Sequence, residues 1–476
     1  MLRKLAILLS FCFLFTFISA CQNKTGSVVA QPDVREIPKI DMGGFNMIYT
    51  AGPDMGVPDG SPFGYLPDST FADSAYAQID KIENAFNCKI ELKYTLKDSM
   101  ASEINTATLA GDLYSDVLDV EDGVIIDMAK ADLLVPMKDV SDIIDIYDAK
   151  KWGTPGMLEA VMLDSQVYAV RASYWPGRYP AFAAPIIFNQ DITAAAGHAD
   201  PREYVEQGKW DRDMFIKLIQ DCTQKDENGT TIYGMSTNST YMFEMAIRTN
   251  NGTIVKKVGD SYVNATGEKE NLDALNWTVD MLKNNPDCFF NGGKAAAREL
   301  FMDTFTDGKA AMFMHPTWAL FTIIGMNVNN WGILPFPNGP ERPNGDWVGY
   351  LAGNRNFIGI SGNSTNIEYT ANILNELYEP LDAYPTYESL MDYYEHYLFH
   401  DKRDLDLYFE MADKSGYNYW YGGGYLISDT LSASFDKKTP LEVVESCSSQ
   451  FQTMIDEYVA GNKPFFENLE NIQVQK

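Results

Sequence analysis

Strand-like and helix-like segments alternate over the first third of the chain, and this alternation limits the possible folds more than any other feature. Short apolar or alternating runs, which indicate strands, fall at 45–49, 88–92 and 115–120. Apolar residues at helical spacing fall at 75–86, 104–110 and 124–130. Strands that alternate with helices form mainly parallel sheets with helices on their faces, so we predict an α/β fold.

The rest of the chain is less regular. Short strands are predicted at 167–171 and 186–189, and helices at 214–219, 272–282 and 387–410. No repeat of fixed period and no low-complexity block is visible.

Acidic residues follow two of the predicted strands. Asp54 comes after the first strand, and Glu121 and Asp122 come after the third. Ligands of parallel sheets bind beyond the carboxyl ends of the strands, so we expect the segments 49–54 and 119–122, with these carboxylates, near a binding edge. A carboxylate there could accept hydrogen bonds from ligand hydroxyls. Glu121 and Asp122 could equally cap the helix that follows them.

The first twenty residues have the layout of an export leader. Arg3 and Lys4 precede an uncharged apolar run at 5–17, which is shorter than the roughly 20 residues of a membrane span. The ending Ile-Ser-Ala-Cys21 resembles the bacterial lipobox, in which the cysteine thiol receives a lipid. We therefore expect a lipoprotein signal peptide at 1–20 and a lipid-anchored flexible tether at 21–42. A plain cleaved signal and an uncleaved anchor are the alternatives.

Charge and length narrow the class further. The formal net charge is −29, which argues against nucleic acid as a partner and weakly favours neutral ligands. No later run of 18 or more apolar residues occurs, so we expect the mature chain to be soluble apart from its tether. The chain is long enough for two or more domains.

Cysteine and histidine usage gives no sign of a metal site or a cofactor. Cys88, Cys222, Cys288 and Cys447 are isolated in sequence, so no CxxC pair is available for a metal, although one or two disulfides are possible in an exported chain. His396 and His400 could share a helix face, but no HExxH frame supplies a further ligand. We predict no metal and no cofactor.

Several short phrases occur in the order found in the bacterial extracellular solute-binding proteins of family 1, the sugar-binding components of ABC importers. The phrases that resemble the family stand at 109–117, 133–137, 164–170, 187–191, 210–215, 305–312, 332–337 and 359–361. The run Phe-Thr-Asp-Gly-Lys-Ala-Ala-Met at 305–312 matches the family pattern most closely. In 164–170, Ser165 and Gln166 replace the usual Gly-Lys, and Arg171 replaces the proline that commonly follows.

The resemblance implies a periplasmic-binding-protein-like, two-lobed clamp in which each lobe is a sheet flanked by helices, with a hinge between the lobes. The expected first lobe is 43–187 plus about 352–378, and the expected second lobe is 188–351 plus about 379–476. Closure around a ligand would be a hinge motion. The implied partners are a carbohydrate, ABC permease subunits and the membrane at the outer cell surface. We expect a monomer.

Sugars offer apolar C–H faces and hydroxyl groups, so their sites combine aromatic rings with carboxylate, amide and guanidinium groups. Aromatic residues make up 13% of the chain, and those in predicted loops are candidates for ligand contact. The aromatic candidates are Trp175, Trp318, Trp420 and Tyr421. Arg171 and Arg178 could donate to hydroxyls or to a uronate carboxylate, or could instead pair with acidic groups of the protein.

Three other functions are compatible with an exported acidic chain. A carbohydrate-active enzyme would need a carboxylate pair, but 66 acidic residues make chance pairs inevitable. No GxSxG, HExxH or phosphate-binding loop occurs, so we predict that the chain is not an enzyme. A receptor for a peptide or another solute, and a surface adhesin, are the remaining alternatives.

Overall fold

The structure is a computed structural model. It describes residues 35–52, 70–95, 97–153, 155–164, 166–172, 175, 176, 178, 182, 183, 185–259, 261–316, 328–351, 356–417 and 421–473. Residues Ile37–Lys476 form one unit by their contacts, and within it the buried apolar residues gather into two cores, each built on its own sheet.

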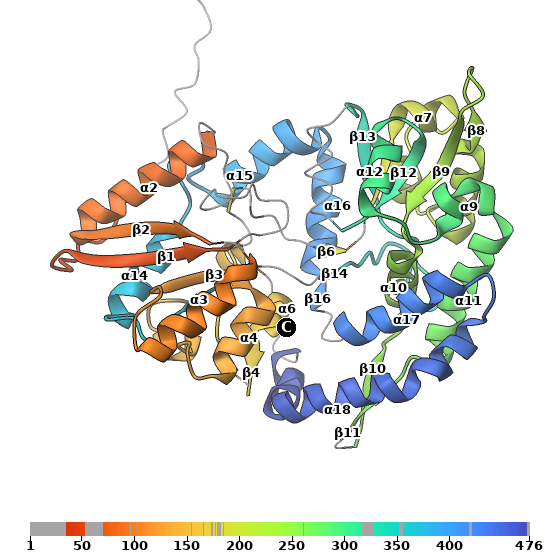
Figure 1. The fold of residues 1–476 in the computed structure, drawn as a ribbon. Helices are drawn as coiled ribbons and strands as arrows, with labels where there is room; N and C mark the ends of the chain where they lie inside the picture. The colour runs from red at the N-terminus through yellow and green to blue at the C-terminus, as the bar shows by residue number, and fades with distance from the viewer. Residues whose placement is uncertain are drawn as a thin grey trace, which may run out of the picture. The chain divides into compact units, whose positions relative to one another are not determined.

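The first sheet has four strands in the order β15-β3-β1-β2, and three of them are parallel. Its strands are β1 (Phe45–Ala51), β2 (Cys88–Tyr94), β3 (Val117–Glu121) and β15 (Asn356–Ile360). The helices next to it in sequence are α2 (Thr70–Phe86), α3 (Lys97–Ala110) and α4 (Asp122–Lys130). Figure 1 shows α2 on one face of this sheet and α3 and α4 on the other. The predicted α/β pattern of this region is confirmed.

The fourth strand, β15, comes from far along the chain and runs antiparallel to β3. Its register pairs Asn356 with Glu121 and Ile358 with Asp119. Helix α14 (Ile367–Leu377) follows it and packs on α2. Ile358 and Ile360 are fully buried, so this late segment completes the first core.

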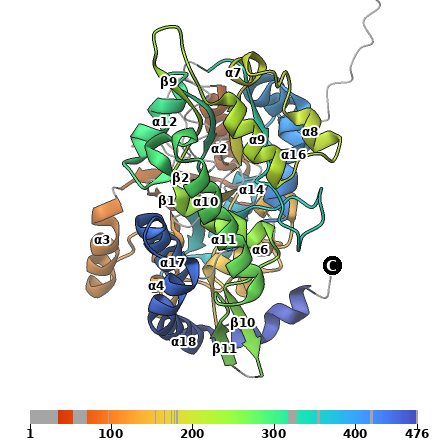
Figure 2. The same ribbon diagram turned by 90° about the vertical axis from the view of Figure 1, so that its right-hand side faces the viewer.

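The second sheet has five strands in the order β13-β7-β12-β9-β8, and only β12 and β9 are parallel neighbours. Its strands are β7 (Ile186–Asn189), β8 (Gln224–Lys225), β9 (Thr231–Thr237), β12 (Ala310–Met314) and β13 (Trp331–Leu334). Helices associated with the second core are α7 (Gln190–Ala195), α8 (Arg202–Glu206), α9 (Arg212–Cys222), α10 (Ser239–Thr249), α11 (Lys269–Asn284), α12 (Arg298–Thr306), α16 (Lys402–Asp413), α17 (Tyr421–Ser434) and α18 (Pro440–Gln473). Figure 2 shows α10 and α11 side by side.

The remaining elements are short. They are the hairpins β4 (Met162–Leu163) with β5 (Gln166–Val167) and β10 (Val255–Val258) with β11 (Ser261–Asn264), the three-stranded sheet of β6 (Phe182–Ala183), β14 (Tyr350–Leu351) and β16 (Gly416–Tyr417), and the helices α5 (Ala149–Trp152), α6 (Pro155–Leu158) and α15 (Tyr387–Tyr394). In the sheet of β6, β14 and β16, three distant parts of the chain pair with one another.

The chain passes between the two cores more than once. Trp175 belongs to the first core and Ile186 to the second, whereas Trp347 belongs to the second and Phe357 to the first. The first core ends at Leu381, after which the chain returns to the second core. Strands β6 and β14 lie within the first two of these passages, so both passages take part in the same small sheet.

Two predicted elements differ in the structure. The single helix predicted at 387–410 is two helices, α15 and α16, separated by a π-helical turn and by His400, which has a left-handed φ of 60°. A side chain at such a φ cannot continue a right-handed helix, and Asp401 instead caps α16 by accepting from the Arg403 N–H. The strand predicted at 167–171 is reduced to β5 and a single bridge between Val170 and Ile358.

A buried ion pair ties α16 to the second sheet. Arg202 is 5% exposed and Asp404 is fully buried, and the guanidinium donates to both carboxylate oxygens at 2.9 and 2.8 Å. Asp404 also accepts from the backbone N–H of Ile333 on β13. Buried charges persist only when paired and hydrogen-bonded in this way, so the two residues hold together segments that are distant in sequence.

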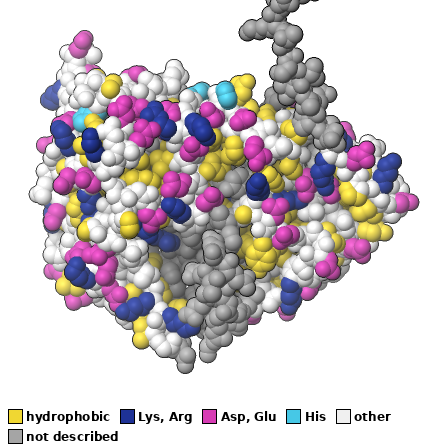
Figure 3. All heavy atoms as spheres, turned by 180° about the vertical axis from the view of Figure 1, so that it is seen from behind, with side chains coloured by type: hydrophobic (Ala, Val, Ile, Leu, Met, Phe, Trp, Pro, Cys, Tyr) yellow, Lys and Arg dark blue, Asp and Glu magenta, His cyan; other side chains and the backbone are white. Residues whose placement is uncertain are grey.

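The four cysteines for which disulfides were left open, Cys88, Cys222, Cys288 and Cys447, are free. Over the described residues, no helix is both long and apolar enough to cross a bilayer. On the face seen in Figure 3, acidic and basic side chains are interspersed, in agreement with the many exposed ion pairs such as Lys217 with Asp221.

The close packing of β9 on α9 generates a prediction for Gly234→Ala. An ideal Cβ at Gly234 would lie 2.1 Å from the backbone oxygen of Ile219, so alanine must push strand and helix apart. We expect the free energy of unfolding, measured in urea, to fall by about 2 kcal/mol. The control is Gly267→Ala, whose Cβ would meet only Val444 Cγ1 at 3.8 Å, and which should change stability by less than about 0.5 kcal/mol. Equal effects of the two substitutions would contradict this packing.

Candidate functional site

The carboxyl ends of β1 and β3 meet at one edge of the first sheet, and Asn356 joins them. Asn356 is 2% exposed, and its side-chain amide donates to the backbone oxygens of Gly52, at 3.1 Å, and Asp119, at 3.0 Å. The Gly52 N–H also donates to the Asp119 oxygen at 2.9 Å. The edge at which parallel strands end is therefore fixed by hydrogen bonds to a residue that arrives from far along the chain.

Asp119 is a fully buried carboxylate at this edge. It accepts from the Tyr49 hydroxyl at 2.8 Å and forms an ion pair with Arg178, whose Nη1 lies 3.3 Å from Oδ1 and whose Nη2 contacts Oδ2. The Tyr49 hydroxyl also lies 2.6 Å from the hydroxyl of Tyr378. The result is a buried network of one carboxylate, one guanidinium and two phenols.

The electrostatics of this network keep its phenols neutral. Burial raises the pKa of Tyr49, and the Asp119 carboxylate raises it further. Burial likewise raises the pKa of Tyr378, although Arg178 opposes this shift. Burial alone would lower the pKa of Arg178, but Asp119 outweighs it and holds the pKa of the guanidinium above its ordinary value. Asp119 and Arg178 therefore compensate each other, and the network presents little net charge.

Trp175 and Arg178 form a tight turn over the network. The Arg178 N–H donates to the Trp175 oxygen at 2.8 Å, and the Trp175 ring packs edge-on against Tyr378 at a centroid distance of 5.2 Å. Trp175 is only 3% exposed, and its indole Nε1 is enclosed without a hydrogen-bond partner. The Tyr394 hydroxyl, from the second core, donates to the Trp175 oxygen at 3.3 Å. A hydrogen bond from α15 therefore ends on this turn.

Arg171 and Glu121 lie beside Asn356. Arg171 is 4% exposed and its Nη1 donates to the Asn356 backbone oxygen at 2.7 Å, while Glu121 is partly exposed and pairs with Asn356 in the ladder. Glu121 occupies the N-cap position of α4 but its side chain makes no capping bond. Asp122 accepts from the N–H of Gly123 at 2.9 Å. The carboxylate of Glu121 thus stands at the edge without acting as the helix cap.

The structure brings together four of the eight residues that the sequence nominated for ligand contact. These are Glu121, Arg171, Trp175 and Arg178, all around Asn356 and Asp119. Asp54, Trp318 and Trp420 lie outside the described residues, as does the nominated lipid attachment site Cys21. Tyr421 begins α17, but its side chain is outside what the structure describes.

The segments predicted near the binding edge contain Tyr49 and Asp119, but neither residue was nominated for ligand contact, and the sequence did not single out Tyr378. One signal for Asp119 was available, because it is a charged residue inside the apolar strand run Val-Leu-Asp-Val-Glu. Tyr378 offered no such signal, since it follows a helix more than 250 positions further along and meets Tyr49 only through folding. Among the described residues, no group of three His, Cys, Asp or Glu side chains could hold a metal ion.

The Asp119–Arg178 pair generates a prediction for stability. Arg178→Met leaves the Asp119 carboxylate buried without its cation, so we expect the free energy of unfolding to fall by about 3 to 5 kcal/mol in urea titrations. The double variant Asp119→Asn with Arg178→Met removes both charges and should recover at least half of that loss.

An exposed pair provides the control. Lys217→Met breaks a surface ion pair with Asp221, in which the lysine side chain is 59% exposed, and should cost less than about 1 kcal/mol. If the double variant at Asp119 and Arg178 were no more stable than Arg178→Met, the two charges would not be compensating each other.

Known proteins match this chain at the level of family and fold. The family model described as bacterial extracellular solute-binding protein matches residues 77–393. A comparison with curated proteins found no match.

Solved structures of sugar-binding proteins share the fold. A cyclic alpha-maltosyl-1,6-maltose binding protein from Arthrobacter globiformis is 13% identical with a TM-score of 0.63, over 87% of this chain and 100% of its own. The GacH receptor of Streptomyces glaucescens is 14% identical with a TM-score of 0.59, over 87% and 99%. The sugar-binding protein MalE from Xanthomonas citri is 13% identical with a TM-score of 0.58, over 89% and 99%.

These neighbours have the two-lobed, periplasmic-binding-protein-like α/β fold, and the two sheets with their separate cores correspond to its two lobes. The predicted fold class is therefore confirmed. The family and its structural neighbours are binding proteins. Since the family model spans more than half of the sequence, the chain belongs to the bacterial extracellular solute-binding proteins.

Proposed function

We propose that this protein is the lipid-anchored, extracellular solute-binding component of an ABC importer. It would bind a carbohydrate, in particular an oligosaccharide, between its lobes and deliver it to a membrane permease. The observation that carries the proposal is the edge of the first sheet, where Glu121 and Arg171 lie beside Asn356 and the Trp175–Arg178 turn meets Asp119 at the strand ends. Ligands of open α/β sheets bind at this edge.

The charge balance of the edge supports a polar, uncharged ligand. Arg178 is compensated by Asp119, and Arg171 is directed to a backbone oxygen, so neither guanidinium stands as an open anion site. Glu121 adds an acceptor for hydroxyl groups at the same edge. The neighbours provide independent support, because the solved structures include a maltose-bound protein from T. maritima and a cycloalternan complex from Listeria monocytogenes.

We propose the lobe boundaries as 43–187 plus about 352–378 for the first lobe and 188–351 plus about 379–476 for the second. The passages of the chain between the two cores support this division. The proposed ligand contacts are Asp54, Glu121, Arg171, Trp175, Arg178, Trp318, Trp420 and Tyr421. Closure of the lobes around a bound sugar would then give the transporter a conformation to recognise.

The ligand prediction is tested by calorimetric titration with linear and cyclic oligosaccharides, and with short peptides as the comparison. We expect saturable binding of an oligosaccharide, with the sugar recovered intact after prolonged incubation. Cleavage of the sugar would contradict the binding function in favour of an enzyme, and selective binding of peptides would favour a receptor for peptides.

A substitution at the edge sharpens this test. Glu121→Gln keeps the shape of the side chain but removes the charge that strengthens hydrogen bonds from hydroxyls, so we expect oligosaccharide affinity to fall about tenfold. Asp127→Asn, on the exposed side of α4, serves as the matched control and should leave affinity unchanged. Equal affinity of the two variants would remove Glu121 from the proposed contacts.

The proposed anchor generates a separate prediction. Cys21→Ala removes the thiol that would carry the lipid, so the protein should move from the membrane fraction to the medium or periplasm on cell fractionation. Ligand affinity should stay the same, because the proposed tether at 21–42 separates the anchor from the folded lobes. Retention of the variant in membranes would contradict lipid attachment at Cys21, and a loss of affinity would contradict the separation of the two functions.

A further inference from the structure

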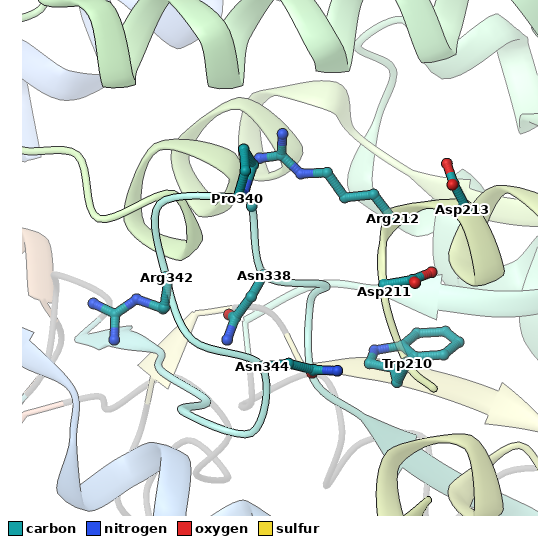
Figure 4. Close-up of a pocket in the computed structure, with 9 residues that line it drawn as sticks. Trp210, Asp211, Arg212, Asp213, Asn338, Pro340, Arg342 and Asn344 are labelled. Atoms are coloured by element: carbon teal, nitrogen blue, oxygen red, sulfur yellow. The ribbon is translucent and has the colours of Figure 1, made fainter. Parts of the chain in front are cut away.

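A cavity of about 410 Å³ lies in the second lobe, away from the residues proposed for the ligand edge. It is bounded by the start of α9 and by the loop that follows β13 (Figure 4). Its lining residues are Trp210, Asp211, Arg212, Asp213, Asn338, Gly339, Pro340, Arg342 and Asn344. The volume is that of a small-molecule site, and none of these residues takes part in the network around Asp119.

The walls of this cavity are held firmly. Trp210 is fully buried and its indole Nε1 donates to the Pro335 oxygen at 2.9 Å. Asn338 donates to the Pro343 oxygen at 2.7 Å, and Asn344 donates across the opening to the Gly208 oxygen at 2.9 Å. The loop is therefore fastened both to itself and to the segment that leads into α9.

Polar atoms without a hydrogen-bond partner gather around this cavity. Arg212 Nε and Nη2, Arg342 Nε and Asn338 Oδ1 are all enclosed, and none has a partner. Asn250 Oδ1 is also enclosed without a partner, and an ideal Cβ at Gly339 would lie 2.0 Å from it and 2.5 Å from Arg212 Nη2. Buried polar atoms in native proteins are almost always paired, so such a group of unpaired atoms beside one cavity requires an explanation.

Arg212 is the most unusual member of the group. Its guanidinium carbon lies 4.2 Å from the centroid of the Trp277 ring, which fixes it by stacking. Among the ion pairs of the described residues none involves Arg212, although the chain carries 66 acidic residues. Burial lowers the pKa of Arg212 to about 10, and Asp273 offsets this only in part. The buried charge thus lacks the carboxylate that Asp404 supplies to Arg202 and Asp119 supplies to Arg178.

The arrangement of groups specifies the chemistry of an occupant. Arg212 offers guanidinium donors that no carboxylate of the described residues occupies, which suits a carboxylate ligand. Arg342 is already paired, because its guanidinium donates to Asp346 and to Asn251 Oδ1. In Figure 4, Arg342 stands on one side of the view and the carboxylates of Asp211 and Asp213 on the other, with the Arg212 side chain reaching toward Pro340.

The two rim carboxylates limit the charge of the occupant. Asp211 and Asp213 are exposed, and Asp211 Oδ1 already accepts from the Met214 N–H at 2.8 Å. They would repel a second negative charge but accept hydrogen bonds from hydroxyls. A molecule with a single carboxylate at one end and hydroxyl groups along the rest satisfies both sides of the cavity.

We propose that this cavity is a second binding site, for a monosaccharide-sized carboxylate that carries hydroxyl groups, such as a uronic acid. The carboxylate binds at Arg212, and the hydroxyls bind at the rim carboxylates Asp211 and Asp213. The site is independent of the oligosaccharide site proposed at the edge of the first sheet, because the two share no residue.

The probe for this site is D-glucuronate, titrated calorimetrically into the full protein at low ionic strength, with D-glucose as the uncharged comparison. We expect saturable binding of glucuronate at least tenfold tighter than that of glucose. Arg212→Gln should weaken glucuronate binding at least tenfold, because it removes the principal partner of the carboxylate. Lys437→Gln removes an equal charge from an exposed position that does not line the cavity, and should leave the affinity unchanged.

A second variant keeps the test decisive if Arg212→Gln fails to fold. Arg212→Lys retains the charge but loses the two-pronged donor geometry, and should weaken glucuronate binding several-fold with a native circular dichroism spectrum. The absence of glucuronate binding to the wild-type protein, or equal affinity in a folded Arg212 variant, would overturn the second site.

The variant Glu121→Gln distinguishes glucuronate binding in the cavity from binding at the edge of the first sheet. Loss of glucuronate binding in Glu121→Gln, with full retention in Arg212→Gln, would assign the acid to the edge of the first sheet and overturn the proposal made here. Oligosaccharide binding should be the same in Arg212→Gln and wild type. A different outcome would contradict only the proposed function. In that outcome, neither the wild-type protein nor any variant binds an oligosaccharide, while glucuronate still binds and its affinity depends on Arg212.

Discussion

A fully buried carboxylate, Asp119, organises the part of this protein on which its proposed function depends. A charge in a buried strand is tolerated only when every oxygen has a partner, and Asp119 obtains its partners from Tyr49 on the neighbouring strand and Arg178 on a distant turn. That requirement brings the Trp175–Arg178 turn onto the sheet edge, where Tyr378 packs beneath it. The position of the proposed ligand contacts is thus a consequence of satisfying one buried charge.

The second lobe also contains a buried aspartate that is paired with an arginine. Asp404 on α16 is fully buried, and it is satisfied by Arg202 from α8 and by a backbone N–H on β13. In both lobes, an arginine from outside the sheet neutralises an aspartate that the fold has buried. Arg212 is the contrasting case, because its guanidinium is partly buried against Trp277 while no carboxylate of the described chain pairs with it. Arg178 and Arg202 thus stabilise the fold through a buried aspartate, whereas Arg212 has no such partner among the described residues.

The edge of the first sheet and the cavity in the second lobe differ in their charges, and this difference bears on which ligand each could bind. At the edge, the charges compensate each other and the remaining groups are an indole, amides and one partly exposed carboxylate. In the cavity, Arg212 has no carboxylate partner among the described residues, Arg342 is paired with Asp346, and Asp211 and Asp213 are exposed at the rim. A neutral oligosaccharide suits the first environment and a small acid suits the second. A protein with two such sites could bind a transported sugar and a separate acidic molecule without competition between them.

The sequence by itself determined the local elements and the family. The alternation of strand and helix patterns predicted β1, β2, β3 and their helices because side-chain periodicity is a local property, and the ordered phrases identified the solute-binding proteins before any contact was known. Only the tertiary structure decided which charges are paired. Asp119 meets Arg178 and Tyr378, and Asn356 joins the ends of β1 and β3, across separations that no local pattern encodes. For the same reason the sequence does not distinguish the roles of Arg171, Arg178 and Arg212. The groups that contact each guanidinium are distant in sequence and come close only when the chain folds.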